Sequence, residues 1–139
     1  MGTLRMPDDV TIGKLLIKAK EAMQMSYAPY SQFNVGAALL DSDGNIFTGC
    51  NVENASYPAT ICAERTAISK AISEGSREFE AIAIVGGHQG EIKGATPPCG
   101  ICRQVLGELC PPDMPVILGK AEGFDCYSIS ELLPVGFVL

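Results

Sequence analysis

The sequence has no Trp, only 6% of its 139 residues are aromatic, and histidine occurs once, at His88. Positive charge is also scarce, since ten Lys and Arg stand against sixteen Asp and Glu, a formal net charge of −6. Proteins that bind polynucleotides hold phosphates with cationic side chains and stack bases on aromatic ones. The shortage of both disfavours a polynucleotide partner and leaves open a small ligand without phosphate groups.

Long hydrophobic runs are absent as well. No apolar stretch reaches the roughly 18–20 residues of a membrane-spanning helix. The first residues also lack the apolar segment of a secretory signal. The six cysteines are about 4% of the chain, below the ~8–10% of disulfide scaffolds. We therefore expect a cytoplasmic protein whose thiols are free or bound to metal.

What the sequence does contain is enough apolar material for a core. Hydrophobic residues make up 47% of the chain, and no repeat or linker divides it. A chain of this length typically forms one domain. We expect a single domain over residues 1–139.

Helical spacing, strand-like apolar runs and turn residues alternate along the chain. They predict helices at 8–25, 62–74, 99–109 and 130–133, and strands at 35–40, 46–50, 79–85, 115–118 and 126–129. The first two strands flank an Asp-Gly turn and form a hairpin, and the third is expected to stop at Gly86 and Gly87. This order predicts an α/β domain with a mixed sheet.

The cysteines carry the first chemical signal. Cys99 and Cys102 form a Cys-x-x-Cys motif, which alone is compatible with a redox pair, a structural zinc site or two chance thiols. Pro98 precedes it, and Cys62 lies upstream with Glu64 two residues later. This combination is much rarer and matches the three-cysteine ligand pattern of zinc deaminases.

Three protein ligands leave the fourth tetrahedral position of zinc open, as in catalytic sites. Zinc lowers the pKa of a water in that position to near 7, and Glu64 is the natural carrier of its proton. Cys62 and Cys99 lie at predicted helix starts, where the helix dipole stabilises thiolates. Cys62 and Glu64 converge only if Cys62 lies at the frayed first turn, because residues two apart do not share a helix face.

Three thiolates around a divalent zinc leave one net negative charge, which a cationic side chain should offset. Arg65, next to Glu64, and Arg103, next to Cys102, are the candidates, and each could instead be a solvated surface arginine. We favour Arg65 as the residue that supports the thiolates, and rank the two roles equally for Arg103.

The motifs together resemble those of the small homotetrameric cytidine deaminases. The similarity covers roughly residues 10–138 and rests on these segments: Asn51-Val52-Glu53-Asn54-Ala55-Ser56-Tyr57, Cys62-Ala63-Glu64-Arg65-Thr66-Ala67, Pro98-Cys99-Gly100-Ile101-Cys102-Arg103-Gln104 and Glu131-Leu132-Leu133-Pro134. The resemblance implies a three-layer α/β/α domain with a mixed central sheet. It also implies one zinc ion per subunit, held by Cys62, Cys99 and Cys102.

The activity implied by the resemblance is hydrolytic deamination of cytidine and deoxycytidine to uridine and deoxyuridine, with release of ammonia, in pyrimidine salvage. Zinc-activated water would attack C4 of the pyrimidine, and Glu64 would pass the proton to N3 and then to the departing amine. The family is homotetrameric and shares its sites between subunits. The nucleoside is the expected small-molecule partner, with no nucleic acid or membrane.

The resemblance also assigns residues to the substrate. Asn51 and Glu53 would bind the ribose hydroxyls. Residues two apart on a strand end point the same way, although a turn cap or a solvated loop is the competing role. Phe33 would stack on the pyrimidine, with core packing as its alternative. The remaining substrate-binding candidates are Ala63, Ala55, Tyr57 and Phe137. In the family, some of these positions contribute to the site of a neighbouring subunit.

Two other functions remain open. One is deamination of another free cytosine compound such as blasticidin S, and the other is a non-catalytic, zinc-stabilised interaction module, which would need a fourth protein ligand. Among the residues without metal spacing, His88 is expected in a solvated loop. Cys50, Cys110 and Cys126 are expected as small buried hydrophobes.

Overall fold

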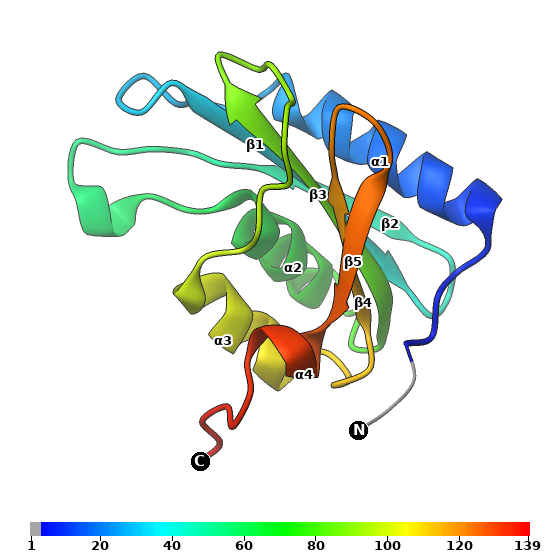
Figure 1. The fold of residues 1–139 in the computed structure, drawn as a ribbon. Coiled ribbons are helices and arrows are strands. Elements are labelled where there is room, and N and C mark those ends of the chain that lie inside the picture. The colour runs from blue at the N-terminus through cyan, green and yellow to red at the C-terminus, as the bar shows by residue number, and fades with distance from the viewer. Residues whose placement is uncertain (1–3) are drawn as a thin grey trace.

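The computed structural model describes residues 4–139, so residues 1–3, part of the segment inspected for a leader, lie outside the described residues. Single helices are separated along the chain by one or two strands (Figure 1). Their order is α1 (Asp9–Met23), β1 (Phe33–Asp41), β2 (Ile46–Cys50), the 3₁₀ turn η1 (Tyr57–Ala59), α2 (Ala63–Ser73), β3 (Phe79–His88), α3 (Gly100–Leu109), β4 (Pro115–Gly119), β5 (Phe124–Ser128) and α4 (Ile129–Leu132).

The strands form one sheet in the order β2-β1-β3-β4-β5. The β3–β4 pair is parallel and the other pairs are antiparallel, so the expected mixed sheet is confirmed. The predicted hairpin is β1–β2, and Gly44 at its turn has a φ of 88°, which an L side chain rarely adopts. Within residues 4–139, no helix has the length and apolar character needed to cross a bilayer.

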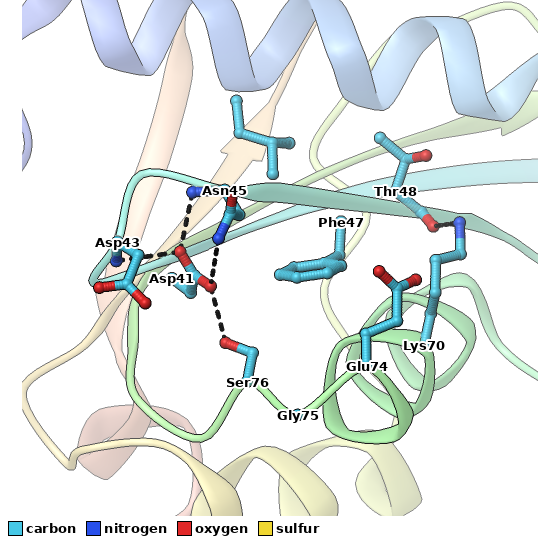
Figure 2. A pocket seen from close by; sticks show the side chains of 10 residues that line it. Asp41, Asp43, Asn45, Phe47, Thr48, Lys70, Glu74, Gly75 and Ser76 are labelled. Carbon is cyan, nitrogen blue, oxygen red and sulfur yellow. Dashed lines mark hydrogen bonds between the residues drawn. The ribbon is translucent and has the colours of Figure 1, made fainter.

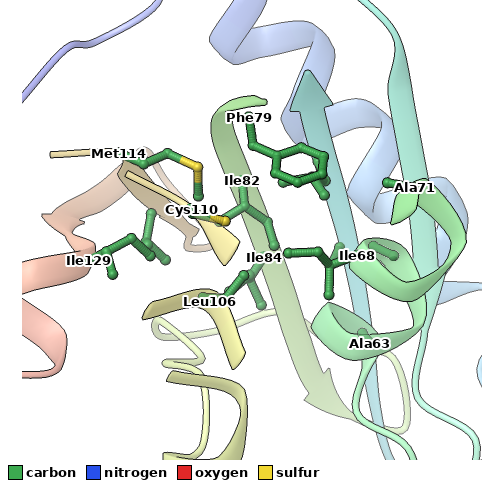
Figure 3. Close-up of a cluster of buried hydrophobic side chains, with 14 of the residues drawn as sticks. Ala63, Ile68, Ala71, Phe79, Ile82, Ile84, Leu106, Cys110, Met114 and Ile129 are labelled. Atoms are coloured by element: carbon green, nitrogen blue, oxygen red, sulfur yellow. The ribbon is translucent and has the colours of Figure 1, made fainter. Parts of the chain in front are cut away.

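Helices cover both faces of the sheet, which confirms the three-layer α/β/α architecture (Figure 1). Side chains alternate along β3, so that Ala83 and Val85 face α1 while Ile82 and Ile84 face α2 and α3. Figure 3 shows the second of these cores, where Ile68 and Leu106 from the helices meet Ile82 and Ile84.

Two glycines let the helices approach the sheet closely. A Cβ on Gly36 would lie 2.0 Å from the carbonyl oxygen of Ala19 in α1. A Cβ on Gly49 in β2 would lie 2.5 Å from the backbone nitrogen of Ala67 and 2.6 Å from the carbonyl oxygen of Ala63. Gly49 therefore determines how close the first turn of α2 lies to the sheet.

Strand β3 is longer than the sequence predicts, since it continues through Gly86 and Gly87 to His88. Gly87 pairs with Asn34, and a Cβ there would lie 1.9 Å from the carbonyl oxygen of Glu91. The glycines serve close backbone approach rather than chain termination. The sequence predicts a loop at His88, but His88 is an exposed strand residue opposite Phe33.

The C-terminal end of α2 borders a cavity of about 510 Å³ beside the β1–β2 turn (Figure 2). Asp41 lies in its wall and accepts hydrogen bonds from the backbone of Asp43, the backbone and amide of Asn45, and the hydroxyl of Ser76. Burial alone raises the pKa of the Asp41 carboxyl, but these hydrogen bonds outweigh it and hold the pKa below its usual range.

Candidate metal centre

Three cysteines meet where the N-termini of α2 and α3 come together. Cys62 is the N-cap of α2, Cys99 is the N-cap of α3, and Cys102 lies in the first turn of α3. Their sulfur atoms all lie within 4.8 Å of one another, and Cys62 Sγ is 3.7 Å from Cys99 Sγ. The cluster runs from buried Cys102 to exposed Cys99, so one side of it opens to the surface.

The geometry of the cluster fits zinc. Tetrahedral thiolate ligands with Zn–S bonds of about 2.3 Å place their sulfurs about 3.8 Å apart, close to the Cys62–Cys99 separation. Neither capping cysteine uses its side chain to cap its own helix, so both sulfurs remain available as ligands. Three soft ligands hold one zinc ion and leave its fourth position for water or substrate.

The surroundings favour thiolate at Cys62. The pKa of Cys62 is lowered to about 5: a hydrogen bond from the Cys102 thiol is the main cause, contacts with Arg65 and Cys99 act in the same direction, and burial opposes them. The same hydrogen bond raises the pKa of Cys102, which keeps its proton while no metal is bound. Thiolates must form for metal binding, so zinc binding would release the proton of Cys102.

Glu64 lies one residue inside α2 and is only 4% exposed. Burial is the main cause that raises the pKa of its carboxyl to about 7; the Cys62 thiolate acts in the same direction, while a backbone hydrogen bond and Arg65 oppose the rise. Because Cys62 is the N-cap and has extended backbone angles, it need not share a helix face with Glu64. A carboxyl with a pKa near 7 can both accept and donate a proton at neutral pH.

The two arginines differ in their contacts. Arg65 Nη2 lies 3.6 Å from Cys62 Sγ and 3.4 Å from the carbonyl oxygen of Thr60, while its Nε is buried without a partner among the described residues. Arg103 instead donates to the carbonyl oxygens of Pro98 at 2.8 Å and Leu132 at 3.0 Å. Arg65 therefore puts positive charge on the sulfur cluster, whereas Arg103 ties the loop before α3 to the end of α4.

The side chains of Asn51 and Glu53 form hydrogen bonds with other residues of the same chain. Asn51 Oδ1 accepts from Ser26 and from the backbone of Val35, and Asn51 Nδ2 donates to the carbonyl oxygen of Phe33 at 2.8 Å. Glu53 accepts from the hydroxyl of Ser31 and from the backbone N–H groups of Tyr30 and Ser31. The hydrogen bond from the Ser31 hydroxyl is the main cause that lowers the pKa of Glu53.

Phe33 begins β1, on the sheet face that α2 and α3 cover. Its side chain is 37% exposed and borders a cavity of about 530 Å³ that reaches His88 and Thr96. Ala63, the first residue of α2, is fully buried beside the cysteine cluster. The structure therefore brings Phe33 to the end of the sheet from which the loop to Cys99 departs.

The other substrate-binding candidates lie on the surface. Ala55 is exposed, Tyr57 is 74% exposed and stacks edge-on against Tyr30, and Phe137 is 68% exposed. The carbonyl oxygen of Phe137 accepts from Gln104 Nε2 of α3 at 3.3 Å. Within one chain, the Phe137 ring thus stays largely in solvent.

Ser26 and Ser31 were not identified from the sequence, although they hold Asn51 and Glu53 in place. Both lie in the connection between α1 and β1, and serines are common in such loops for many reasons. No local pattern could have indicated their partners, which lie more than 20 residues away.

Comparison with known proteins agrees with the site. The family model of the cytidine and deoxycytidylate deaminase zinc-binding region matches residues 11–118. The cytidine deaminase of Halalkalibacterium halodurans is 52% identical over 126 residues, 89% of this chain and 92% of that protein. The corresponding figures for the cytidine deaminase of Sporosarcina psychrophila are 46% over 127 residues, 91% and 90%.

Solved structures agree as well. The crystal structure of cytidine deaminase from Burkholderia pseudomallei superimposes with a TM-score of 0.83 at 48% identity, over 90% of this chain and 98% of that one. The cytidine deaminase from Mycobacterium tuberculosis superimposes with a TM-score of 0.78 at 38% identity, over 96% and 100% of the two chains. The chain belongs to the cytidine deaminase family of zinc-dependent hydrolases.

Proposed function

We propose that the protein catalyses hydrolytic deamination of cytidine and deoxycytidine to uridine and deoxyuridine, with release of ammonia. The observation that carries this function is a buried carboxyl, Glu64, beside three cysteine sulfurs with zinc-ligand spacing. The names of the relatives, which match over about nine-tenths of both chains, support the same activity. A structural zinc module would give Glu64 no function.

In the proposed reaction, the metal activates the water and the protein transfers the protons. Cys62, Cys99 and Cys102 would hold a zinc ion, which would supply a water of lowered pKa. The Glu64 carboxylate takes one proton from the attacking water and gives it to N3 of the ring. It then takes the second proton from the hydroxyl newly bonded to C4 and gives it to the amine, which leaves C4 as ammonia. Its burial excludes bulk water from this transfer, and its pKa of about 7 suits a group that must both take up and release the proton.

Asn51 and Glu53 retain hydrogen-bonding capacity for a sugar. A carboxylate offers about four lone-pair positions, and Glu53 uses three of them within the chain. Asn51 Oδ1 already has two donors, but Asn51 Nδ2 uses only one of its two hydrogens. Glu53 can therefore accept from one ribose hydroxyl, and Asn51 can donate to another.

Assembly into a homotetramer with shared sites is part of the same proposal. The exposed rings of Tyr57 and Phe137 and the exposed Ala55 are available to a neighbouring subunit. The proposal also includes a cytoplasmic location and a role in pyrimidine salvage. All six cysteines have free thiols, as expected in a reducing compartment.

A substrate panel tests the proposed function. The purified zinc-loaded protein is incubated separately with cytidine, deoxycytidine, blasticidin S and a single-stranded oligonucleotide, while absorbance and ammonia release are followed. We expect turnover of the first two compounds. Turnover of only blasticidin S or the oligonucleotide would overturn the assignment, and turnover of none at full zinc occupancy would favour a non-catalytic zinc module.

A further inference from the structure

Two glutamines beside Phe33 have left-handed backbone conformations. Gln32, which precedes Phe33, has a φ of 59°, and Gln89, which follows His88, has a φ of 54°. For a residue other than glycine such a conformation is unfavourable, and it persists only where the surrounding structure determines it. Phe33 and His88 are opposite each other on β1 and β3, so both strained residues lie at the same end of the sheet.

Two hydrogen bonds join Gln32 and Gln89. The backbone N–H of Gln89 donates to the carbonyl oxygen of Gln32 at 2.6 Å, and Gln89 Nε2 donates to Gln32 Oε1 at 3.2 Å. The backbone N–H of Gln32 also donates to the carbonyl oxygen of Ala28. We call the paired side chains and backbones of Gln32 and Gln89 the glutamine clasp.

Packing alone does not hold the ring of Phe33. The cavity of about 530 Å³ lies directly beside it, and its diagonal neighbour on β3, two residues before its partner His88, is Gly86, which has no side chain. A Cβ on Gly86 would lie 3.2 Å from Phe33 Cε2 and 2.8 Å from the hydroxyl of Thr96. The ring therefore has free space on one side, and its direction depends on the backbone that carries it.

That backbone is held on both sides. The Phe33 N–H donates to the hydroxyl of Ser31, and the Phe33 carbonyl oxygen accepts from Asn51. The glutamine clasp adds a third restraint, because it fixes the residue before Phe33 to the end of β3. The clasp borders the same cavity through Gln89.

We propose that the glutamine clasp is a positioning device that aims the ring of Phe33 at the pyrimidine of the substrate. The inference rests on the proposed function, in which Phe33 stacks on the base. Gln32 and Gln89 touch neither the cysteine cluster nor Glu64 in this account, so they act on substrate binding and not on the proton transfer.

The test uses Gln89→Asn and Gln89→Gly in the zinc-loaded enzyme. Asn tolerates a left-handed backbone but is too short to reach Gln32, and Gly removes both strain and side chain. Loss of a hydrogen bond worth about 1 kcal/mol corresponds to about a fivefold weaker binding of the substrate. We expect KM for cytidine to rise about fivefold in both variants, with kcat within twofold and zinc content unchanged.

A double-mutant cycle with Phe33→Leu separates positioning from general stability. If the clasp acts through the ring, Gln89→Asn should leave KM unchanged in the Phe33→Leu background. Gln24→Ala, at the exposed end of α1, is the matched control and should behave as the unmodified enzyme.

An equal rise in KM in the Phe33→Leu background would overturn the proposal, as would a wild-type KM in Gln89→Gly. A fall in kcat or zinc content that accompanies any rise in KM would also overturn it, since the clasp would then support the fold as a whole. Failure of the proposed function can be told apart from failure of this inference, because in the former case the unmodified protein would not deaminate cytidine at all.

Discussion

At the scale of single residues, Arg65 links the helix to the metal centre. Its guanidinium contacts the Cys62 sulfur, and three thiolates around a divalent zinc leave a net negative charge that it can offset. Its position one residue after Glu64 also places positive charge near the carboxyl, where it opposes the rise in pKa that burial causes. The same side chain therefore influences both the ligands and the proton carrier.

Replacing Arg65 by Gln should weaken zinc binding by about tenfold to a hundredfold, the usual cost of losing a group that supports metal ligands. Competition with a chelator at fixed pH measures the effect. Arg77→Gln, at the other end of α2 where Arg77 donates to the carbonyl oxygens of Ile72 and Ser76, is the control. Equal zinc affinity in the Arg65→Gln variant and the unmodified protein would show that Arg65 does not support the ligands.

At the scale of elements, the approach of α2 to β2 determines where Cys62 and Glu64 lie. Gly49 allows that approach, because a Cβ there would meet the backbone of Ala63 and Ala67 at 2.5–2.6 Å. Backbone atoms cannot move aside as a flexible side chain can. A larger residue at position 49 must therefore displace the first turn of α2, which carries the site.

Gly49→Ala should lower the free energy of unfolding by about 2–3 kcal/mol and reduce the zinc bound per chain. Gly13 in α1 has open space around its Cβ position, so Gly13→Ala should instead stabilise the protein by about 0.5–1 kcal/mol. Denaturant unfolding and metal analysis of both variants measure this contrast. Full zinc content with unchanged stability in Gly49→Ala would contradict the close approach.

The β1–β2 turn provides a pH-dependent test of local structure. The hydrogen bonds to Asp41 lower its pKa in the folded state, so its contribution to stability is complete above the unfolded pKa of about 4 and is lost as the pH falls through the lower folded value. Asp41→Asn should therefore reduce stability by about 2 kcal/mol at pH 7. This deficit should shrink as the pH falls below about 4.

Unfolding free energies of both proteins between pH 7 and pH 3 measure this change. Asp43→Asn, in the same turn but exposed, is the control and should change stability little. Parallel pH profiles for the Asp41→Asn variant and the unmodified protein would show that the carboxylate charge does not stabilise the turn.

At the scale of the whole molecule, the sequence predicts the layers and the metal ligands well. Hydrophobic periodicity identifies the elements, and the spacing of Cys62, Cys99 and Cys102 indicates a zinc site that the fold assembles at two helix N-termini. The elements depend on local patterns, whereas the three layers and the full ligand set follow from motifs that resemble those of the cytidine deaminases, which is why sequence reasoning reaches both. The substrate-binding assignments of Phe33, Asn51 and Glu53 stay predictions.

The contacts that sequence reasoning misses are long-range ones. Gly86 and Gly87 have the composition of a strand end, yet β3 continues because the chain after His88 folds back against Gly87. The pairing of Gln32 with Gln89 joins residues 57 positions apart. Turn residues and glutamines carry no local signal that identifies their partners, so only the folded structure shows them.

Assembly can be tested through the exposed C-terminal ring. We expect the protein to sediment as a homotetramer and Phe137→Ala to raise KM about fivefold, the effect of losing an aromatic contact worth about 1 kcal/mol. Stability should not change, because the ring is mostly exposed within one chain. Val138→Ala, also exposed, is the control, and a fully active monomer would remove the shared-site proposal.

The central claim is that Glu64 carries the proton at a zinc centre made by three cysteines. Measurement of bound zinc and cytidine turnover on the same sample of Glu64→Gln tests it most directly. The amide keeps the shape of the side chain but cannot accept and return the proton, so zinc per chain should equal that of the unmodified enzyme while kcat falls at least about a hundredfold. Cytidine turnover within a few-fold of the unmodified enzyme, at equal zinc content, would contradict the account.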